Sequence, residues 1–516
     1  MQKFVSDTRN VRSTGLTVRP NGMRRSAVVI GGGFGGMAAA LRLRAMGMSV
    51  TLVERQSALG GRAQVFEKDG FRYDAGPTII TAPFLIDELF ELFGRRRADY
   101  INLIPLNPWY RFYFQDNSTF DYGGTIEDTL AEIARFAPGD EDGYLRMLGH
   151  SKALYDIAFT ELSQKPFDRL SMLLSQAPRL ARLRADQSVW TRVSRYLANE
   201  KLRRAFSVQP LLIGGNPFST TSIYMLIHHL ERESGVFFAA GGTGALVEAL
   251  ARLMQEQGVR VMLDTTVSEV TVENGKASGV VLEGGERLGS DVVVSNADPS
   301  YLYDRMLPRR SLRLPTRAKL NLRLSMGLFL VYFGTRRTYP DVAHNTIWFG
   351  SRYKELLGDI IDRKKLADDF SLYLQRPTAT DPSFAPPGCD SFYALCPVPN
   401  NTSGIDWEAE TPRLRTRIVE AFERTLLPGL SQHIVSEMCM TPDDFEHRSL
   451  STAGNGFAAA PSFLQSAWFR FHNRSESIPN LYLVGAGTHP GAGIPGVLCS
   501  ARIAADAVAA GISVQG

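Results

Sequence analysis

Short apolar runs and glycine-rich turns alternate at both ends of this chain. Near the N-terminus, the β-branched run at 27–30 predicts a buried strand, and the small apolar residues at 37–41 predict a helix. The run at 50–53 predicts a neighbouring strand. Near the C-terminus, residues 481–484 predict a further buried strand, followed by a helix over about 497–509. Strands that alternate with helices in this way are typical of an α/β fold.

The turn between the first strand and the first helix has the spacing GxGxxG. Gly31, Gly33 and Gly36 occupy its three glycine positions, with Phe34 and Gly35 between the last two. The first glycine permits a tight turn, the second lets the backbone approach a diphosphate, and the third lets the helix and strand pack closely. The diphosphate then lies at the helix N-terminus, where free N–H groups favour an anion. We therefore expect a dinucleotide site here.

The residues that follow indicate which dinucleotide is bound. The second strand ends at Glu54, about twenty residues beyond the glycines, where an acid holds ribose hydroxyls and disfavours a phosphorylated ribose. Arg62 is expected to neutralise a diphosphate, and Gly61, Gly76 and Pro77 permit close approach of the backbone to a cofactor. A nicotinamide site does not need these additions, so they point to FAD.

The C-terminal strand enters a second glycine-rich turn, at 485–496. The helix that starts there has a partial positive end, which would stabilise negative charge developing on a reduced flavin. Two such turns in one chain predict a flavoprotein. The cofactor-binding residues expected in this turn are Gly485, Gly487, Thr488, Gly491, Gly493 and Ile494.

Three stretches carry a resemblance to a known family. They are GGGFGGMAAALRL at 31–43, GGRA at 60–63 and NLYLVGAGTHPGAGIPGVLCSA at 480–501. These stretches resemble the bacterial-type phytoene desaturases, FAD-dependent oxidoreductases of carotenoid biosynthesis, and the similarity runs from residue 26 nearly to the C-terminus. It implies a Rossmann-like FAD-binding domain assembled from discontinuous segments. A mixed-sheet substrate domain and a helical membrane-facing region are also implied.

The chain is divided accordingly. Residues 1–25, with six basic residues and one acid, are predicted to be a disordered tail. The predicted FAD-binding domain comprises 26–100, 236–299 and 451–516; the predicted substrate domain comprises 101–150 and 300–450; and the predicted membrane-associating region is 151–235.

Turn signals predict hairpins within the stretch 260–295. Asn274-Gly275 and Gly284-Gly285 are both typical of tight turns between antiparallel strands. Val267 lies on the first of these strands. The resemblance implies that its backbone holds the adenine of FAD.

The reaction implied by the resemblance removes two hydrogens from neighbouring saturated carbons of phytoene, one as hydride to the flavin and one as a proton. The conjugated polyene is thereby extended toward neurosporene or lycopene. Because phytoene is uncharged, apolar burial must bind it. The candidate lining is the segment 324–333 with Trp109, Tyr110, Phe112 and Tyr113.

His489 is the candidate catalytic residue, because it is the titratable group nearest the flavin-side turn in sequence. Arg470 and His472 are further candidates for accepting the proton. No metal site is expected, since the adjacent His228 and His229 would face different directions on a helix.

Other activities fit the same cofactor motifs. They include a later-step carotenoid desaturase, a carotenoid isomerase that uses reduced FAD, and a carotenoid oxidase or ketolase. An amine oxidase is disfavoured, because the expected aromatic and covalent-flavin arrangement is missing from the sequence. Outside enzymes, the alternative is a membrane-surface flavoprotein without turnover. The final electron acceptor is expected to be oxygen or a quinone, and the sequence leaves the number of desaturation steps and the oligomeric state open.

Composition limits the class of protein further. The 516 residues are 44% hydrophobic and 21% charged, which excludes a mostly disordered chain. Four cysteines without a CxxC pair predict no disulfide framework and indicate a reducing compartment. No apolar run approaches the roughly 18 residues of a membrane-spanning helix, so none is expected.

The formal net charge of +4 conceals a second basic stretch at 178–204, with eight basic residues and two acids. Its apolar residues recur at helical spacing among arginines, which predicts a basic helix that lies on an anionic membrane surface. No nucleic-acid recognition motif accompanies it. We therefore expect a cytoplasmic enzyme that associates peripherally with the membrane. The apolar residues are Leu180, Leu183, Trp190, Val193 and Leu197, and the arginines are Arg179, Arg182, Arg192 and Arg195.

Overall fold

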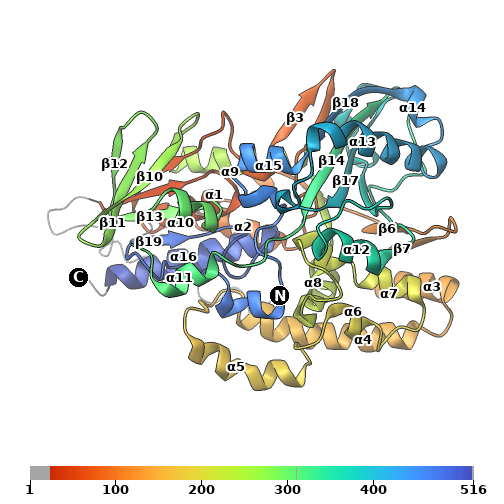
Figure 1. Cartoon of the computed structure of the whole chain (residues 1–516), viewed down its shortest axis with the longest axis horizontal. Coiled ribbons are helices and arrows are strands. Elements are labelled where there is room, and N and C mark those ends of the chain that lie inside the picture. The colour runs from red at the N-terminus through yellow and green to blue at the C-terminus, as the bar shows by residue number, and fades with distance from the viewer. Residues whose placement is uncertain (1–23, 309–310, 514–516) are drawn as a thin grey trace.

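The computed structural model describes residues 24–308 and 311–513, so almost all of the predicted tail at 1–25 lies outside the described residues. Figure 1 shows one sheet with its helices on the left and a larger sheet on the right. A group of helices lies along the lower right, below the larger sheet, and α5 (Leu170–Arg182) lies below the rest of the chain.

The left-hand sheet has five parallel strands in the order β19-β13-β1-β2-β9. Alternate residues of β1 face opposite sides, as in any strand. Ala27 and Val29 pack with the helices α1, α9 and α16, whereas Val28 and Ile30 pack toward a small antiparallel sheet. Because both faces are covered, these strands are almost continuously apolar. The elements are β1 (Ser26–Ile30), α1 (Phe34–Ala45), β2 (Ser49–Val53), α9 (Gly242–Glu256), β9 (Arg260–Met262), β13 (Val292–Ser295), β19 (Leu481–Leu483) and α16 (Ile494–Ser513).

The predicted strands and helices at both chain ends are confirmed within one to four residues at their boundaries. The hairpins are confirmed as well. The strands β10 (Val267–Glu273), β11 (Lys276–Leu282) and β12 (Arg287–Gly289) form a three-stranded antiparallel sheet. Asn274 and Gly275 both have positive φ, 49° and 75°, as the tight turn between β10 and β11 requires.

The larger sheet has seven strands in the order β18-β14-β17-β16-β15-β6-β7. Its neighbours are antiparallel except for β15 and β6, which run parallel, so the predicted mixed sheet is confirmed. All nine residues of β14 are buried, with Phe329 facing α13 (Trp407–Arg424) and Leu328 facing the opposite side. The strands are β6 (Tyr110–Tyr113), β7 (Thr119–Tyr122), β14 (Gly327–Thr335), β15 (Asn345–Trp348), β16 (Leu372–Gln375), β17 (Asp390–Val398) and β18 (Ile434–Met440).

The remaining elements connect and cover these two sheets. The shorter strands are β3 (Val65–Lys68), β4 (Phe71–Asp74), β5 (Leu103–Pro105) and β8 (Phe237–Ala239). The helices are α2 (Pro83–Glu91), α3 (Ile126–Phe136), α4 (Glu141–Tyr155), α6 (Val189–Val193), α7 (Glu200–Phe206), α8 (Leu226–Ser234), α10 (Pro299–Arg305), α11 (Leu314–Lys319), α12 (Tyr353–Ile361), α14 (Leu430–His433) and α15 (Pro442–Ser449).

The predicted continuous basic helix at 178–204 is wrong. The stretch is divided among α5, α6 and α7, with a break at Arg184, whose φ is 54°. Val193 and Leu197 are fully buried in the same core as Phe206. Trp190 packs against the aromatic rings of Phe218 and Tyr353. Helical spacing of apolar residues signals one apolar face, and here most of that face packs against protein.

One helix of the described residues, α16, is long and apolar enough by length and composition to cross a membrane. Half of it is buried inside the protein. Leu498, Ala501 and Val508 belong to the core that α16 shares with α1. A core helix of a large α/β domain reaches this composition because it is covered on several sides.

We expect Leu197→Ala to lower the free energy of unfolding by about 2–5 kcal/mol, because it leaves a cavity in a closed core. The matched change Leu174→Ala, on exposed α5, should stay within about 0.5 kcal/mol of the parent. Chemical denaturation followed by circular dichroism measures both. Equal effects of the two substitutions would contradict the assignment of Leu197 to the core.

Candidate FAD site and adjoining cavity

The first glycine turn joins β1 to α1 at the carboxyl edge of the parallel sheet. Gly31 has φ of 91°, which favours glycine. A Cβ at Gly36 would overlap the carbonyl oxygen of Gly31, so the helix packs directly onto the turn. α1 begins without a side-chain cap and without an acid in its first turn. Its N–H groups therefore fit an anionic diphosphate.

Asn296, which follows β13, lies between the two glycine turns. A Cβ at Gly33 would lie 2.9 Å from Asn296 Nδ2, and one at Gly35 would lie 2.6 Å from Oδ1. A Cβ at Gly485, in the C-terminal turn, would also lie 2.6 Å from that oxygen. Asn296 is not among the predicted cofactor-binding residues. Its signal is a polar residue directly after a buried parallel strand, where ligands of such sheets bind.

Glu54 ends β2 and is buried beside the first turn. Its Oε2 accepts a hydrogen bond from the Gly32 N–H at 2.7 Å, and its Oε1 accepts one from the Gln56 N–H at 2.8 Å. The carboxylate thus braces the turn, and it also lines the cavity. Each oxygen retains a lone pair for a ribose hydroxyl, as the prediction requires.

The predicted residues between β2 and α2 gather against the first turn. A Cβ at Gly61 would lie 3.3 Å from the Gly33 Cα, and one at Gly76 would overlap the carbonyl of Arg62. Arg62 donates from Nη2 to Ser451 Oγ at 2.5 Å. Burial lowers the pKa of Arg62, against the opposing charge of Asp298, and a guanidinium in this position remains a cation.

Three further predicted residues complete this part of the cavity lining. Pro77 lies in the cavity wall next to Gly76. Val267, at the start of β10, lies in the wall beside Thr265 and Thr266. Phe34, at the start of α1, lines the same cavity. The structure therefore brings together predicted residues from the first glycine turn, the second strand and the hairpin.

The C-terminal turn places most of its predicted residues at the same cavity. Gly485, Gly487, Gly491, Gly493 and Ile494 all line it. The turn is fixed by internal hydrogen bonds, among them the Gly485 N–H to Ser500 Oγ at 2.9 Å. Thr488 points away from the cavity, and its Oγ1 donates to the Gly485 carbonyl at 2.9 Å. Thr488 therefore shapes the turn from within.

His489 does not line the cavity. Its ring lies 4.9 Å from that of Phe167, on the inner side of the turn. Burial, with the nearby charge of Arg470, lowers the pKa of His489 to about 3. Both ring nitrogens lack a hydrogen-bond partner among the residues that the structure describes. This placement disfavours His489 as the group that accepts a proton from a substrate.

The two other candidates for accepting the proton, Arg470 and His472, also make their contacts outside the cavity. Arg470 is buried beneath the turn and donates to the backbone carbonyls of Ala459 and Pro490. His472 Nδ1 lies 2.7 Å from Glu476 Oε1, which also pairs with Lys319. Neither Arg470 nor His472 lines the cavity.

The same cavity continues from the FAD site into an apolar region between the large sheet and the helices. Of the predicted lining, Tyr110 and Leu328 do face it, whereas Trp109, Phe112 and Tyr113 do not. Trp109 instead packs under the guanidinium of Arg232. The apolar lining consists of Phe159, Val208, Leu211, Ile347, Phe349, Tyr373, Tyr393, Leu395 and Pro397, among others.

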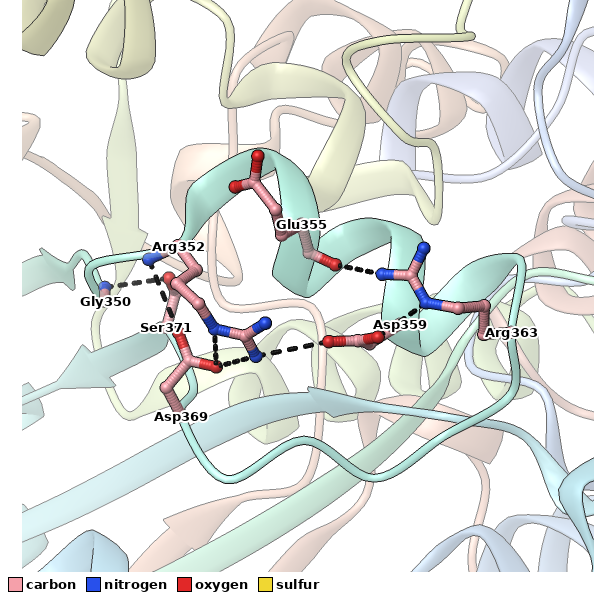
Figure 2. Close-up of polar contacts among 7 residues, drawn as sticks. All are labelled: Gly350, Arg352, Glu355, Asp359, Arg363, Asp369 and Ser371. Carbon is pink, nitrogen blue, oxygen red and sulfur yellow. Dashed lines mark hydrogen bonds and ion pairs between the residues drawn. The ribbon is translucent and has the colours of Figure 1, made fainter.

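Ion pairs anchor one wall of this apolar region. Figure 2 shows Arg352 between Asp369 and Asp359, with Arg363 on the other side of Asp359. The nearest N···O distances are 2.5 Å to Asp369 and 3.2 Å to Asp359 from Arg352, and 2.6 Å to Asp359 from Arg363. These contacts hold the loop after α12 against that helix. The residues that follow the loop, 371–372, lie in the cavity wall.

Within 24–308 and 311–513, no group of three or more His, Cys, Asp or Glu side chains is placed to hold a metal ion. The four cysteines are free thiols. The polar chemistry of the site thus comes from backbone N–H groups, carboxylates, Arg62 and the two helix N-termini.

Two glycine turns that converge on one parallel sheet, with an acid at the end of β2, define an FAD-binding oxidoreductase. The profile of the family described as flavin containing amine oxidoreductase matches residues 34–509. An oxidoreductase of known structure from Methanosarcina mazei has the same fold, with a TM-score of 0.61 and 16% identity. That similarity covers 94% of this chain and 99% of the other.

Within that class, more specific relatives are found. A lycopene-forming phytoene desaturase of Pseudescherichia vulneris is 46% identical over 93% of this chain and 98% of its own length. A neurosporene-forming phytoene desaturase of Rhodobacter capsulatus is 44% identical over 96% of this chain and 95% of its own. The chain belongs to the phytoene desaturase family, and its cofactor is FAD.

We expect Gly36→Ala to weaken FAD binding by about tenfold or more, because overpacking costs typically 1–3 kcal/mol and each 1.4 kcal/mol is tenfold in affinity. Flavin absorbance per mole of purified protein measures this. Gly149→Ala is the matched control, since no atom lies within 4 Å of its added methyl group. A Gly36→Ala protein that retains FAD as the parent does would refute the assignment of the first turn.

Proposed function

We propose that this protein is an FAD-dependent phytoene desaturase of carotenoid biosynthesis. The observation that carries the proposal is the single cavity that joins the FAD site to a region of aromatic and aliphatic side chains. An uncharged polyene offers nothing for an ion pair, so it must be bound by apolar burial, at about 25 cal/mol per Å². The lycopene- and neurosporene-forming relatives support the same class of substrate and of product.

Each group of lining residues has a separate role, which is set by its position along the cavity. The N-terminus of α1 with Arg62 would hold the diphosphate, Glu54 the ribose, and Val267 the adenine end. FAD supplies the acceptor for the hydride. The N-terminus of α16 lies at the cavity and favours negative charge there. The apolar wall excludes water and aligns the polyene. Oxygen or a quinone is the proposed final electron acceptor.

We also propose that α5 is the surface that docks on the membrane, from which a lipophilic polyene must be extracted. None of its 13 residues is buried, and Leu170 and Leu174 are 46% and 61% exposed. α5 packs near the turn that follows Phe463 and Leu464, which are also exposed. A helix with this much uncovered apolar surface is stabilised by a lipid interface.

The charges around α5 favour an anionic lipid surface. Arg169 precedes the helix, and Arg179 and Arg182 lie in its last turn. Arg179 forms an ion pair with Glu161, with 2.8 Å between Nη2 and Oε1. The exposed apolar residues and the arginines lie together on the part of the molecule that is lowest in Figure 1. We accordingly propose a cytoplasmic enzyme that is peripherally attached through α5, rather than through the whole of 178–204.

Anaerobic mixing with phytoene in liposomes should bleach the visible absorbance of the bound flavin, with new absorption from a longer polyene. The measurement is a diode-array absorbance record of a single turnover. Phytoene that leaves the flavin oxidised, while a hydroxylated or partly desaturated carotenoid bleaches it, would reassign the substrate. A flavin that no polyene bleaches would favour the non-catalytic alternative.

The double variant Leu170→Ser and Leu174→Ser should bind anionic vesicles about tenfold more weakly, because it removes apolar area from the interface. Co-sedimentation with phosphatidylglycerol vesicles measures the binding, and high salt should release the parent protein. The control is Leu263→Ser with Val435→Ser, two exposed apolar residues away from α5. Equal loss in both double variants would argue against α5 as the docking surface.

A further inference from the structure

A buried carboxyl group adjoins the apolar part of the cavity. Glu231 lies on α8, has no exposed surface and belongs to the cavity lining. The other acids of the lining, Glu54 and Asp298, lie at the FAD end beside the first glycine turn and α10. Among the described residues that line the apolar part, Glu231 is thus the one acid. A carboxyl group in such a wall is costly to ionise, because burial penalises its charged form.

Glu231 lies on a helical stretch that begins beside the flavin-side turn. Tyr224 lies beside that turn, since a Cβ at Gly491 would be 3.8 Å from its Oη. Tyr224 lies in the 3₁₀ turn Ser222–Met225, which runs directly into α8, and Glu231 follows it by seven residues. Tyr224, Ile227 and Glu231 all line the cavity, so this helical face runs from the turn into the apolar part.

The hydrogen bonds around Glu231 leave one oxygen free. Oε1 accepts a hydrogen bond from Tyr110 Oη at 3.0 Å. Oε2 has no partner among the described residues. The nearby Gln209 directs its Nε2 to His228 Nδ1, at 3.2 Å. The other His228 nitrogen, Nε2, lies 2.9 Å from the Phe206 carbonyl, to which it donates. Nδ1 of the neutral ring is therefore the acceptor.

Burial raises the pKa of Glu231 to about 7, although Tyr110, Arg232 and Gln209 partly oppose this effect. Arg232 points away, over the rings of Trp109 and Tyr122. With a pKa close to neutrality, a carboxyl group is partly deprotonated at neutral pH and still accepts a proton efficiently.

The groups that face Glu231 from the surrounding elements do not titrate near neutrality. Burial lowers the pKa of His228 to about 4, so its ring is neutral. Burial raises the pKa values of Tyr110, Tyr122 and Tyr373 above the ordinary value of a phenol, so these side chains keep their protons near neutral pH. Arg232 remains a cation throughout. Glu231 is consequently the member of this group that changes charge between about pH 5 and 9.

We propose that Glu231 is the catalytic residue that accepts the proton from the polyene during desaturation, an inference that rests on the proposed function. One C–H bond of the substrate breaks with its electron pair, which leaves as hydride to FAD. The C–H bond on the neighbouring carbon then breaks, its electrons form the new C=C bond, and its proton goes to Oε2 of Glu231. The substrate loses two hydrogens and two electrons, so the single turnover balances without a further reactant.

The physical reason is the environment of Oε2. After hydride departure the neighbouring C–H is acidic, and it needs a base in a wall from which water is excluded. A carboxylate oxygen that accepts no hydrogen bond retains its full basicity.

The test is the rate at which the longer polyene forms from phytoene, followed by its new absorption, in anaerobic single turnovers over pH 5 to 9. For the parent protein, the rate should rise with pH through about 7, because the base works when it is deprotonated. Glu231→Gln keeps the size of the side chain and an acceptor for Tyr110. It should slow polyene formation by about 10²–10⁴-fold and remove the pH dependence, with FAD content unchanged. Glu233→Gln, an exposed glutamate on the same helix, is the matched control and should behave as the parent does.

A second variant keeps the test decisive if Glu231→Gln is poorly folded. Tyr110→Phe removes a donor that lowers the pKa of Glu231, so the whole pH profile should move to higher pH. A parental rate in Glu231→Gln, or an unmoved profile in Tyr110→Phe, would overturn the proposal. These outcomes are separate from failure of the proposed function, in which phytoene would not reduce the flavin of the parent protein at all.

Discussion

The register of three parallel strands holds the FAD site together. Ser295 of β13 pairs with Ile30 of β1 on one side and with Leu483 of β19 on the other. The three strands therefore end at one level, and the chain leaves them side by side into the first glycine turn, Asn296 and the C-terminal turn. Contact between these segments requires glycine, since a Cβ at Gly35 or Gly485 would lie 2.6 Å from the Asn296 amide. Residues almost the whole chain apart thus build one anion-binding surface with two helix N-termini.

The rest of the molecule extends this surface into an apolar space. The larger sheet contributes one of its faces, with Ile347, Tyr373 and Leu395, and its other face packs on α13. The helix α8 contributes part of the opposite wall and carries Glu231 into it. Carboxyl groups of the lining are thereby confined to the FAD end and to this one buried position. A long uncharged substrate fits this distribution, because apolar contact binds it and very few polar groups must be desolvated.

The stretch 178–204 shows how far a periodic pattern can be interpreted. Its apolar spacing correctly signalled helical structure with a buried face, but it did not identify what covers that face. Val193 and Leu197 pack into the protein, whereas Leu170 and Leu174, just before the stretch, remain uncovered. Membrane and protein core both accept apolar side chains at helical spacing, so the two are indistinguishable in the sequence. The break at Arg184 and the packing partners decide between them.

By itself, the sequence determined the local parts of this protein: the two strand–turn–helix units, the hairpins and the glycine positions of the two turns. These follow from interactions within a few residues, where positive φ, close helix packing and alternating burial limit the choice of amino acid. Only the tertiary structure decided which side chains face the cavity. His489 and Thr488 lie outside the cavity lining, Asn296 lies between two turns that are distant in sequence, and Glu231 lies in an apolar wall. Those outcomes depend on how separate segments pack against each other, which a motif of neighbouring residues does not specify.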